Sequence, residues 1–247
     1  MARVSFTMAC AFFPLLCAGC TGSGQNAHRD PPPGPKPAMQ PAPATPIEKK
    51  KEELGGKTWD PQWDVLVEQA LPPDMLSPRA ARAVSIYCPR FSEETEAEKR
   101  AFWAYLFQAL AGAEAGLNPT SDVHHTERVL EKTDSVTHRP IRQEGLLQLA
   151  YEDAQRYGCD FDWSHDRTLP AKSPERTILQ PSKNLGCGIK IMDDQIVTKG
   201  EPLVTRHSYW ATLQPGTRSH RIFLKQMANV PAACGRRVER ARRVRRR

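Results

Sequence analysis

The chain has 247 residues and a formal net charge of +7, and 26% of its residues are charged. Residues 236–247 contain eight Arg and one Glu, so this tail carries the whole net charge and the rest of the chain is close to neutral. Because no aromatic or basic surface pattern accompanies these arginines, the charge does not indicate a nucleic-acid-binding protein.

Residues 1–19 have the features of a bacterial secretory signal peptide. The run from Val4 to Ala18 is uncharged and ends in small residues, and it is too short to span a bilayer. The small residues directly before Cys20 resemble a lipoprotein processing box, which would make Cys20 the lipidated first residue of the mature chain and its membrane anchor. Cys17 stands where such boxes usually have Leu, so ordinary signal cleavage also fits.

Residues 20–57 are expected to form a lipid-anchored tether. Two stretches, Asp30–Pro37 and Pro41–Pro46, are rich in proline, which favours an extended and semi-stiff conformation. Thr21, in place of Asp, after the cysteine resembles lipoproteins that are passed to the outer membrane. We therefore expect an exported protein of the bacterial cell envelope, held in the periplasm as an outer-membrane lipoprotein.

Residues 58–235 are expected to form one mainly α domain (α+β), large enough to bury a substantial core. Apolar periodicity and capping signals predict helices at Trp63–Ala70, Pro78–Tyr87, Thr95–Glu114, Leu147–Tyr157, Asn184–Asp193 and Arg221–Asn229. Strand content is expected only in a hairpin, formed by His125–Leu130 and Val136–Ile141 around the polar turn Lys132–Ser135. The tail at 236–247 fits contact with anionic lipids or acidic cell-wall polymers, or a basic end without a partner.

Glu114 stands at the C-terminal end of the helix that begins at Thr95. Trp103, Phe107, Leu110 and Glu114 follow one another at steps of four, three and four, so the carboxyl group continues the stripe that faces the core. Burial and the partial negative charge of a helix C-terminus both disfavour the ionised form, so we expect a raised pKa. Such a carboxyl can protonate a glycosidic oxygen. The alternative is a Glu at a frayed helix end, turned to solvent or capping a loop.

Two later segments accompany this carboxyl. Glu114 is followed by Ala-Gly-Leu-Asn-Pro, Gly145–Leu149 is Gly-Leu-Leu-Gln-Leu, and Asn184–Met192 begins Asn-Leu-Gly-Cys-Gly. In this order they resemble the three motifs of the soluble lytic transglycosylase family: Glu-Ser followed by Asn-Pro, then Gly-Leu-Met-Gln, then Asn-Ile leading to a Gly and a short apolar run. The resemblance covers roughly residues 101 to 192 and extends to a later Tyr209-Trp210.

This resemblance implies a lysozyme-like helical fold and cleavage of the β-1,4 bond between N-acetylmuramic acid and N-acetylglucosamine in peptidoglycan strands. In that family one Glu protonates the leaving oxygen and then takes the proton of the muramoyl 6-hydroxyl, so that a 1,6-anhydro ring closes and no water is consumed. Glu114 would carry both transfers, without a cofactor or metal ion, in a protein expected to be a monomer. The residues expected to border or contact the sugar, or to hold the helix that closes the site, are Gly145, Leu147, Gln148, Asn184 and Tyr209.

Two departures from the family pattern leave other functions open. Ala115 stands where the family has Ser, so a hydroxyl near the site is absent. The 25 residues between Pro119 and Gly145 exceed those of compact members, and the insertion would lie beside the cleft. Its acidic residues fit solvated hairpin charges or the second carboxylate of a lysozyme-type hydrolase: Asp122, Glu127, Glu131 and Asp134. A noncatalytic peptidoglycan-binding lipoprotein with a degenerate cleft is the further alternative.

The four cysteines of the domain favour two disulfides, because their number is even and the protein is expected to be exported. Of the three possible pairings we prefer Cys159 with Cys187 and Cys88 with Cys234, since the first pair would join the segments that follow two of the motifs. Free buried thiols are the alternative. A metal site is not expected, because none of these four cysteines shows a Cys-x-x-Cys spacing. His124, His125 and His165 are interpreted as surface residues.

Overall fold

The structure is a computed structural model that describes residues 58–123 and 132–235. The predicted signal peptide, Cys20, the tether and the arginine-rich tail lie outside these ranges. The same holds for residues 124–131, which include the predicted strand His125–Leu130, His124, Glu127 and Glu131. Within the two described ranges, none of the helices combines the length and the hydropathy that crossing a bilayer requires.

The centre of the fold is one long helix, α4 (Glu96–Ala115). It begins with the predicted capping box: Thr95 Oγ1 accepts the Glu98 N–H at 3.3 Å, and Glu98 Oε2 accepts the Thr95 N–H at 2.8 Å. It ends at Gly116, whose φ of +57° is a left-handed conformation that glycine adopts without steric cost. Every residue from Phe102 to Gly112 is buried, so other elements enclose this helix on all sides.

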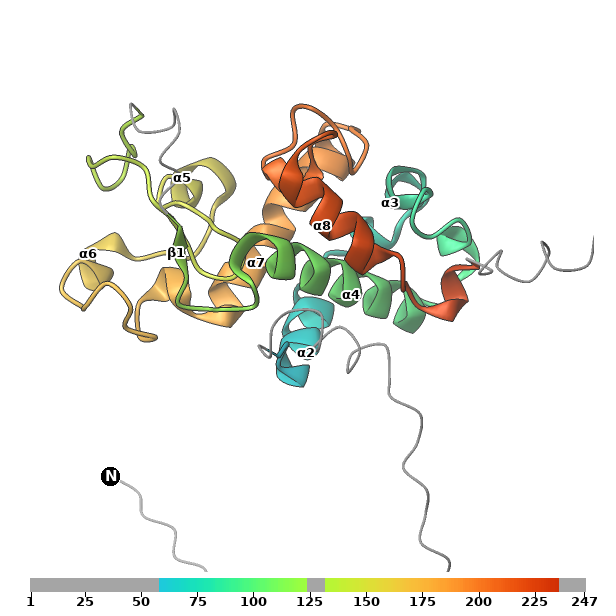
Figure 1. Ribbon diagram of the computed structural model, residues 1–247, viewed down its shortest axis with the longest axis horizontal. Coiled ribbons are helices and arrows are strands. Elements are labelled where there is room, and N and C mark those ends of the chain that lie inside the picture. The colour runs from blue at the N-terminus through green and yellow to red at the C-terminus, as the bar shows by residue number, and fades with distance from the viewer. Residues whose placement is uncertain (1–57, 124–131, 236–247) are drawn as a thin grey trace, which may run out of the picture. The chain divides into compact units, whose positions relative to one another are not determined.

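The helices α2 (Pro61–Ala70) and α8 (Arg218–Met227) pack against α4. Figure 1 shows α4 between them, and α2 also contacts α7 (Pro181–Asp193). At the contact with α8, a Cβ added at Gly112 would lie 2.8 Å from Gln226 Oε1, so glycine allows the close approach of the two helices. Tyr105 donates its hydroxyl to Gln226 O at 2.6 Å across the same contact.

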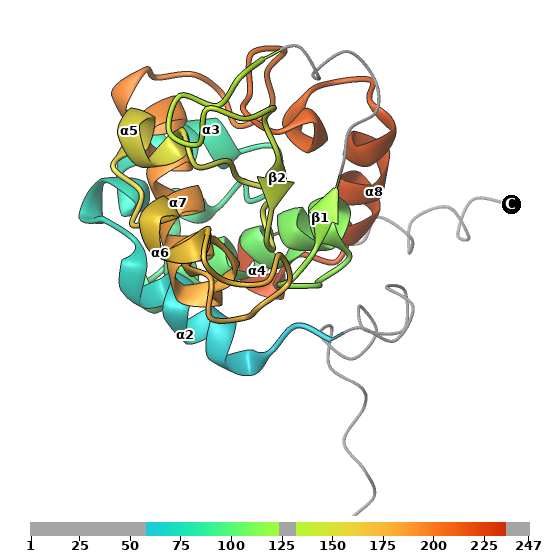
Figure 2. The ribbon, with the colours of Figure 1, turned by 90° about the vertical axis from the view of Figure 1, so that its left-hand side faces the viewer.

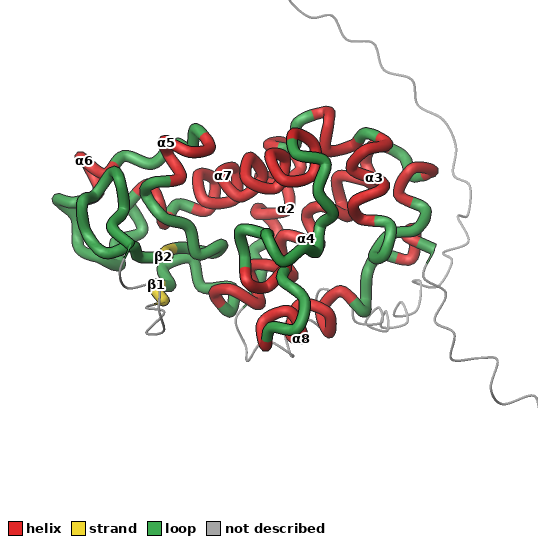
Figure 3. The backbone as a smooth tube through the Cα atoms, turned by 90° about the horizontal axis from the view of Figure 1, so that it is seen from above, coloured by secondary structure: helices red, strands yellow, loops and turns green. Residues whose placement is uncertain are grey.

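Short elements complete the domain, and helices dominate it (Figure 3). The short helices are α3 (Pro78–Val84), α5 (Asp153–Tyr157) and α6 (Trp163–Asp166), with single turns η1 (Pro73–Leu76), η2 (Phe91–Glu93), η3 (Thr177–Leu179), η4 (Asp194–Thr198), η5 (Ala211–Leu213) and η6 (Ala232–Cys234). The strands β1 (Asp122–Val123) and β2 (Gln143–Glu144) form an antiparallel pair, with Asp122 opposite Glu144. The mainly α fold class with a small β element is confirmed.

The predicted hairpin differs from the observed one. The paired strands stand at the base of the insertion, and the predicted strand Val136–Ile141 is wrong, because residues 135–139 form turns. An isolated bridge joins Thr133 to Pro140 on either side of these turns. The reason is Asp134, whose Oδ1 accepts the backbone N–H groups of the second and third residues after it, both at 2.8 Å. This local side-chain bonding competes with strand pairing and stabilises a turn.

The predicted helix Leu147–Tyr157 begins too early, since α5 starts at Asp153. Its first residues belong instead to a tight turn in which Gly145 has φ +81° and Gln148 has φ +52°. We call residues Gly145–Leu149 the glycine turn. The N–H and C=O groups of Glu144 and Leu149 pair across it at 2.8 and 2.9 Å. An apolar run that looks helical in sequence is therefore buried as a turn.

Most apolar side chains form one core that includes most of α4, and a second, smaller cluster is separate from it. Figure 2 shows the end of the domain that carries α5, α6 and the two strands. The second cluster contains Tyr151, Ile178 and Leu179, with Trp163 packed against it. The disulfides take the preferred pairing, Cys88–Cys234 and Cys159–Cys187, with sequence separations of 146 and 28 residues. The second of these ties the segment after α5 to α7.

Candidate active site

Glu114 lies in the last turn of α4 and is partly exposed as a residue. Its Oε1 atom is buried and has no hydrogen-bond partner in the part of the chain that the structure describes. Burial raises the pKa of this carboxyl, against an opposing influence of the Thr212 hydroxyl and backbone N–H. The expected direction of the pKa shift is therefore confirmed, and the group does not simply point into solvent.

Thr212, in η5, is the residue that faces this carboxyl, and it is fully buried. Its Oγ1 also lacks a partner at hydrogen-bonding geometry within the described ranges, so the two polar groups approach without forming a regular hydrogen bond. His220 holds the Thr212 backbone from α8: its Nδ1 lies 2.8 Å from Thr212 O. Because a carbonyl only accepts, this nitrogen donates. A small movement would let the Thr212 hydroxyl donate to an ionised Glu114.

The glycine turn is fastened to the segment that follows α4. The Gly145 N–H donates to Ser121 O at 2.8 Å, and Gln148 Nε2 donates to Gly145 O at 2.7 Å. Position 145 requires glycine, because its φ is +81° and an added Cβ would overlap the Asn184 side chain. Gln148 and Leu147 are buried, so in this structure they shape the turn from within.

Asn184, in α7, clamps the glycine turn from the other side and is fully buried. Its Oδ1 accepts the Leu147 N–H at 2.9 Å, and its Nδ2 donates to Glu144 O at 3.2 Å and to Ile178 O at 2.8 Å. Trp210 Nε1 donates to Leu147 O at 2.8 Å. The structure thus brings together the second and third sequence motifs and the later Tyr-Trp pair. Contact of these residues with a sugar stays a prediction.

Tyr209 is held by a buried carboxyl that the sequence analysis did not single out. Its hydroxyl donates to Asp153 Oδ2 at 2.7 Å, and the Ala150 N–H donates to the same oxygen at 2.9 Å. Burial raises the pKa of Asp153 to about 6, although the Tyr209 hydrogen bond acts in the opposite direction. Since this hydroxyl already donates its hydrogen bond to Asp153, its oxygen is left only as an acceptor for a further hydrogen bond.

Tyr209 lines a polar cavity of about 420 Å³. The cavity lies between β2, α5 and η4, and its wall includes Gln143, Ala150 and Tyr157. Tyr157 and Tyr209 meet edge to face, with ring centroids 6.2 Å apart. Glu114 is not part of this wall. The cavity therefore lies next to the glycine turn. Tyr209, in its wall, is three residues before Thr212, the residue that faces the Glu114 carboxyl.

The acidic residues of the insertion that the structure describes are already engaged. Asp122 pairs with Arg142 at 2.7 Å and lies 3.8 Å from Lys172. Asp134 is buried, and besides its turn bonds it accepts the Glu152 N–H at 2.9 Å. Neither is a free carboxylate in this arrangement, whereas a general base or nucleophile has to approach the sugar.

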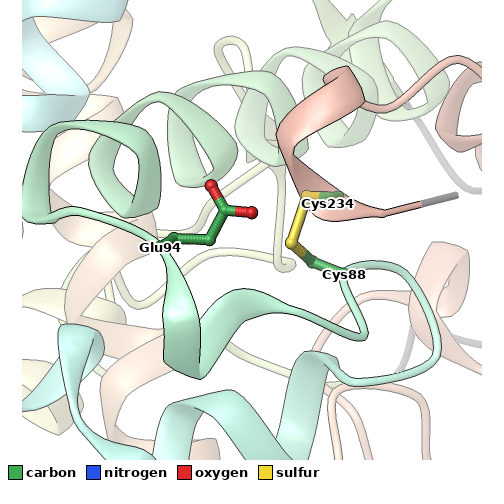
Figure 4. Close-up of side chains that lie close together, drawn as sticks. All are labelled: Cys88, Glu94 and Cys234. Carbon is green, nitrogen blue, oxygen red and sulfur yellow. A yellow bond between two sulfur atoms is a disulfide. The ribbon is translucent and has the colours of Figure 1, made fainter.

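One group of potential metal ligands occurs within the described ranges: Cys88, Cys234 and Glu94, whose ligand atoms lie within 4.8 Å of one another. Figure 4 shows that the two sulfur atoms are bonded to each other. Sulfur binds metals as a thiolate, so only the Glu94 carboxylate remains as a ligand, which does not make a metal site.

The chain matches no protein-family model and no curated protein. Solved structures of DslA (Bd0314) from Bdellovibrio resemble it: a wild-type form with a TM-score of 0.52, and two variants with one Glu changed to Gln, with TM-scores of 0.53 and 0.52. Each is 22% identical and covers 70% of this chain and 91% of the DslA chain. At this identity the likeness shows the fold alone, which is lysozyme-like. The two disulfides are consistent with an exported protein.

Proposed function

We propose that this protein is a peptidoglycan lytic transglycosylase, a lyase that cleaves the bond between N-acetylmuramic acid and N-acetylglucosamine and leaves a 1,6-anhydro end. The observation that carries the proposal is Glu114, a carboxyl with a raised pKa at the end of the central helix of a lysozyme-like fold. A carboxyl with a raised pKa keeps its proton to higher pH, and a protonated carboxyl is the group that the leaving glycosidic oxygen requires.

In the proposed reaction Glu114 acts twice. It first gives its proton to the glycosidic oxygen as the bond from that oxygen to C1 of the muramoyl sugar breaks. The resulting carboxylate then takes the proton of the muramoyl 6-hydroxyl, whose oxygen bonds to C1 and closes the anhydro ring. Atoms balance without water, and Glu114 regains its proton. The Thr212 hydroxyl would stabilise the carboxylate between the two steps, since its influence already lowers the pKa of Glu114.

Two observations support this reaction over hydrolysis. Hydrolysis needs a second carboxylate, as a base that activates water or as a nucleophile. Of the four candidates for it, the structure describes two: Asp122 is held in an ion pair with Arg142, and Asp134 bonds three backbone N–H groups. A single acid and base at Glu114 requires neither of them.

The cavity beside Tyr209 supports recognition of a sugar chain. Sugars present hydroxyl and amide groups around apolar ring faces, and this cavity combines polar walls with two partly buried tyrosine rings. The proposal has the glycan strand bind in this cavity and extend beyond it to Glu114, which is not part of the cavity wall. A lipid anchor at Cys20 and the proline-rich tether would place a monomeric enzyme at the outer membrane, facing the peptidoglycan.

A noncatalytic peptidoglycan-binding protein is the second candidate function. It is favoured by the position of Glu114 outside the wall of the 420 Å³ cavity, and by Ala115 in place of the family serine. In that case the cavity binds the wall polymer and Glu114 is unused.

Digestion of purified peptidoglycan tests the proposal. The parent protein should release soluble muropeptides whose mass is lower by one water than that of hydrolysed products. Glu114→Gln should abolish the release, because the amide neither donates nor accepts the transferred proton, while the exposed Glu175→Gln is the matched control and should keep full activity. Hydrated reducing ends would assign a hydrolase. Sedimentation of the parent with peptidoglycan, without any release, would assign the noncatalytic function.

A further inference from the structure

A second cavity, of about 150 Å³, lies on the other side of the same hairpin. Along β2 and the segment before it, Ile141 and Gln143 line the 420 Å³ cavity, whereas Arg142 and Glu144 line this one. Neighbouring residues of an extended chain point to opposite faces, so the two cavities back onto one hairpin. The smaller one is several times the volume of a water molecule, which is about 30 Å³ in the liquid.

The acidic groups in its wall have their acceptors occupied. The Glu144 carboxylate receives both terminal nitrogens of Arg176, which is 5% exposed. Asp166 accepts the Tyr151 hydroxyl at 2.8 Å and the Thr177 hydroxyl at 2.6 Å. Asp134 bonds three backbone N–H groups. None of these carboxylates is left to attract a cation.

What remains in the wall is donors and positive charge. Arg176 Nε is buried and has no hydrogen-bond partner in the described part of the chain. The Arg139 guanidinium stacks over the partly exposed Trp163 ring, 5.2 Å from its centroid. Arg139 and Arg167 are exposed, and neither forms an ion pair with another described residue. A buried donor of a charged group is costly when unpaired, and an anionic acceptor would satisfy it.

We propose that this cavity binds a carboxylate group and, on the basis of the proposed function, that the group is a free carboxylate of a peptidoglycan peptide stem. The exposed Arg139 and Arg167 offer guanidinium forks that match carboxylate geometry, and Arg176 Nε adds a buried donor. A sugar chain with a peptide branch would contact both faces of the hairpin. Glycan strands that carry a peptide stem would therefore bind more tightly than strands without one.

Isothermal titration calorimetry of the full chain with an isolated tetrapeptide stem tests this inference. The double change Arg139→Gln and Arg167→Gln removes two exposed charges without touching the buried pair, and should weaken binding at least tenfold. The matched control, Arg206→Gln with Arg221→Gln, removes two exposed charges elsewhere and should leave binding unchanged. A stem peptide with all carboxylates amidated should not bind, and acetate should compete only at far higher concentration.

Equal binding of the amidated peptide, or unchanged binding by the Arg139 and Arg167 double variant, would overturn the inference. If acetate bound as tightly as the peptide, the assignment to the peptide stem would be overturned, and the cavity would be a site for small free carboxylates. The same titration with Glu114→Gln separates the two proposals: stem binding should persist there, whether or not the parent cleaves peptidoglycan.

Discussion

Asn184 offers a direct test of how the site is assembled, because one buried side chain makes three hydrogen bonds to the turn and its surroundings. Asn184→Ala removes the bonds to the Leu147 N–H and to the Glu144 and Ile178 carbonyls. Each bond contributes about 1 kcal/mol, and a buried group left unpaired costs about 1–3 kcal/mol. Allowing for relaxation and for water that enters the space, we expect a loss of about 4 kcal/mol in the free energy of unfolding.

Urea unfolding, followed by circular dichroism, measures this loss. With a slope of about 2 kcal/mol per molar urea, the midpoint should fall by about 2 M at an unchanged slope. Asn184→Asp keeps the shape, but the oxygen that replaces Nδ2 would face the Glu144 and Ile178 carbonyls, so this variant should be at least as destabilised at pH 7. Asn229→Ala, at an exposed position after α8, is the control and should change stability by less than about 0.5 kcal/mol. A loss below about 1 kcal/mol for Asn184→Ala would refute the clamp.

Three further predictions concern packing, covalent links and protonation. A Cβ at Gly188 would overlap the side chain of Leu147 in the glycine turn, so Gly188→Ala should lower the free energy of unfolding by about 1–3 kcal/mol. Gly186→Ala, on the same helix, places its Cβ in open space and should be neutral or stabilising. Equal melting temperatures for the two variants would contradict this packing. Replacing both Cys159 and Cys187 by Ser should lower the free energy of unfolding by about 3.5 kcal/mol, from the chain entropy of a loop of 28 residues. If adding a reductant left the urea midpoint of the parent protein unchanged, the bond would be contradicted. The pKa of Asp153 is about 6 in the folded protein, against an ordinary 3.8, so this carboxyl should contribute about 3 kcal/mol of stability that is full below pH 3.8 and is lost as pH rises through 6. Asp153→Asn should remove this pH dependence of stability. Parallel stability curves of variant and parent from pH 4 to 8 would contradict the shift.

The parts of the site that follow local rules could be predicted from the sequence. The capping box at Thr95 and the apolar steps to Glu114 depend only on residues within one helix, and both the helix and the direction of the Glu114 pKa shift are confirmed. The preferred disulfide pairing depended on two motifs lying side by side, and the structure has that pairing.

The parts of the site that depend on long-range contacts could not be predicted from the sequence. Gln148 adopts a left-handed conformation because Asn184 and Ser121, far away in the chain, hold the turn around it, and an apolar run alone resembles a helix. Thr212 carries no sequence signal of its own, and neither does Asp166, which is buried in α6 directly after His165. Arg176 could have been suspected only as the partner of Glu144, the acidic residue that directly precedes the glycine turn.

Digestion of peptidoglycan in ¹⁸O-labelled water is the most direct test of the central claim, that Glu114 alone moves both protons and that no water enters the product. Mass spectrometry of the muropeptides should show anhydro ends without the label, formed by the parent and absent with Glu114→Gln. Reducing ends that carry one ¹⁸O atom, or release that survives in the Glu114→Gln variant, would contradict the account.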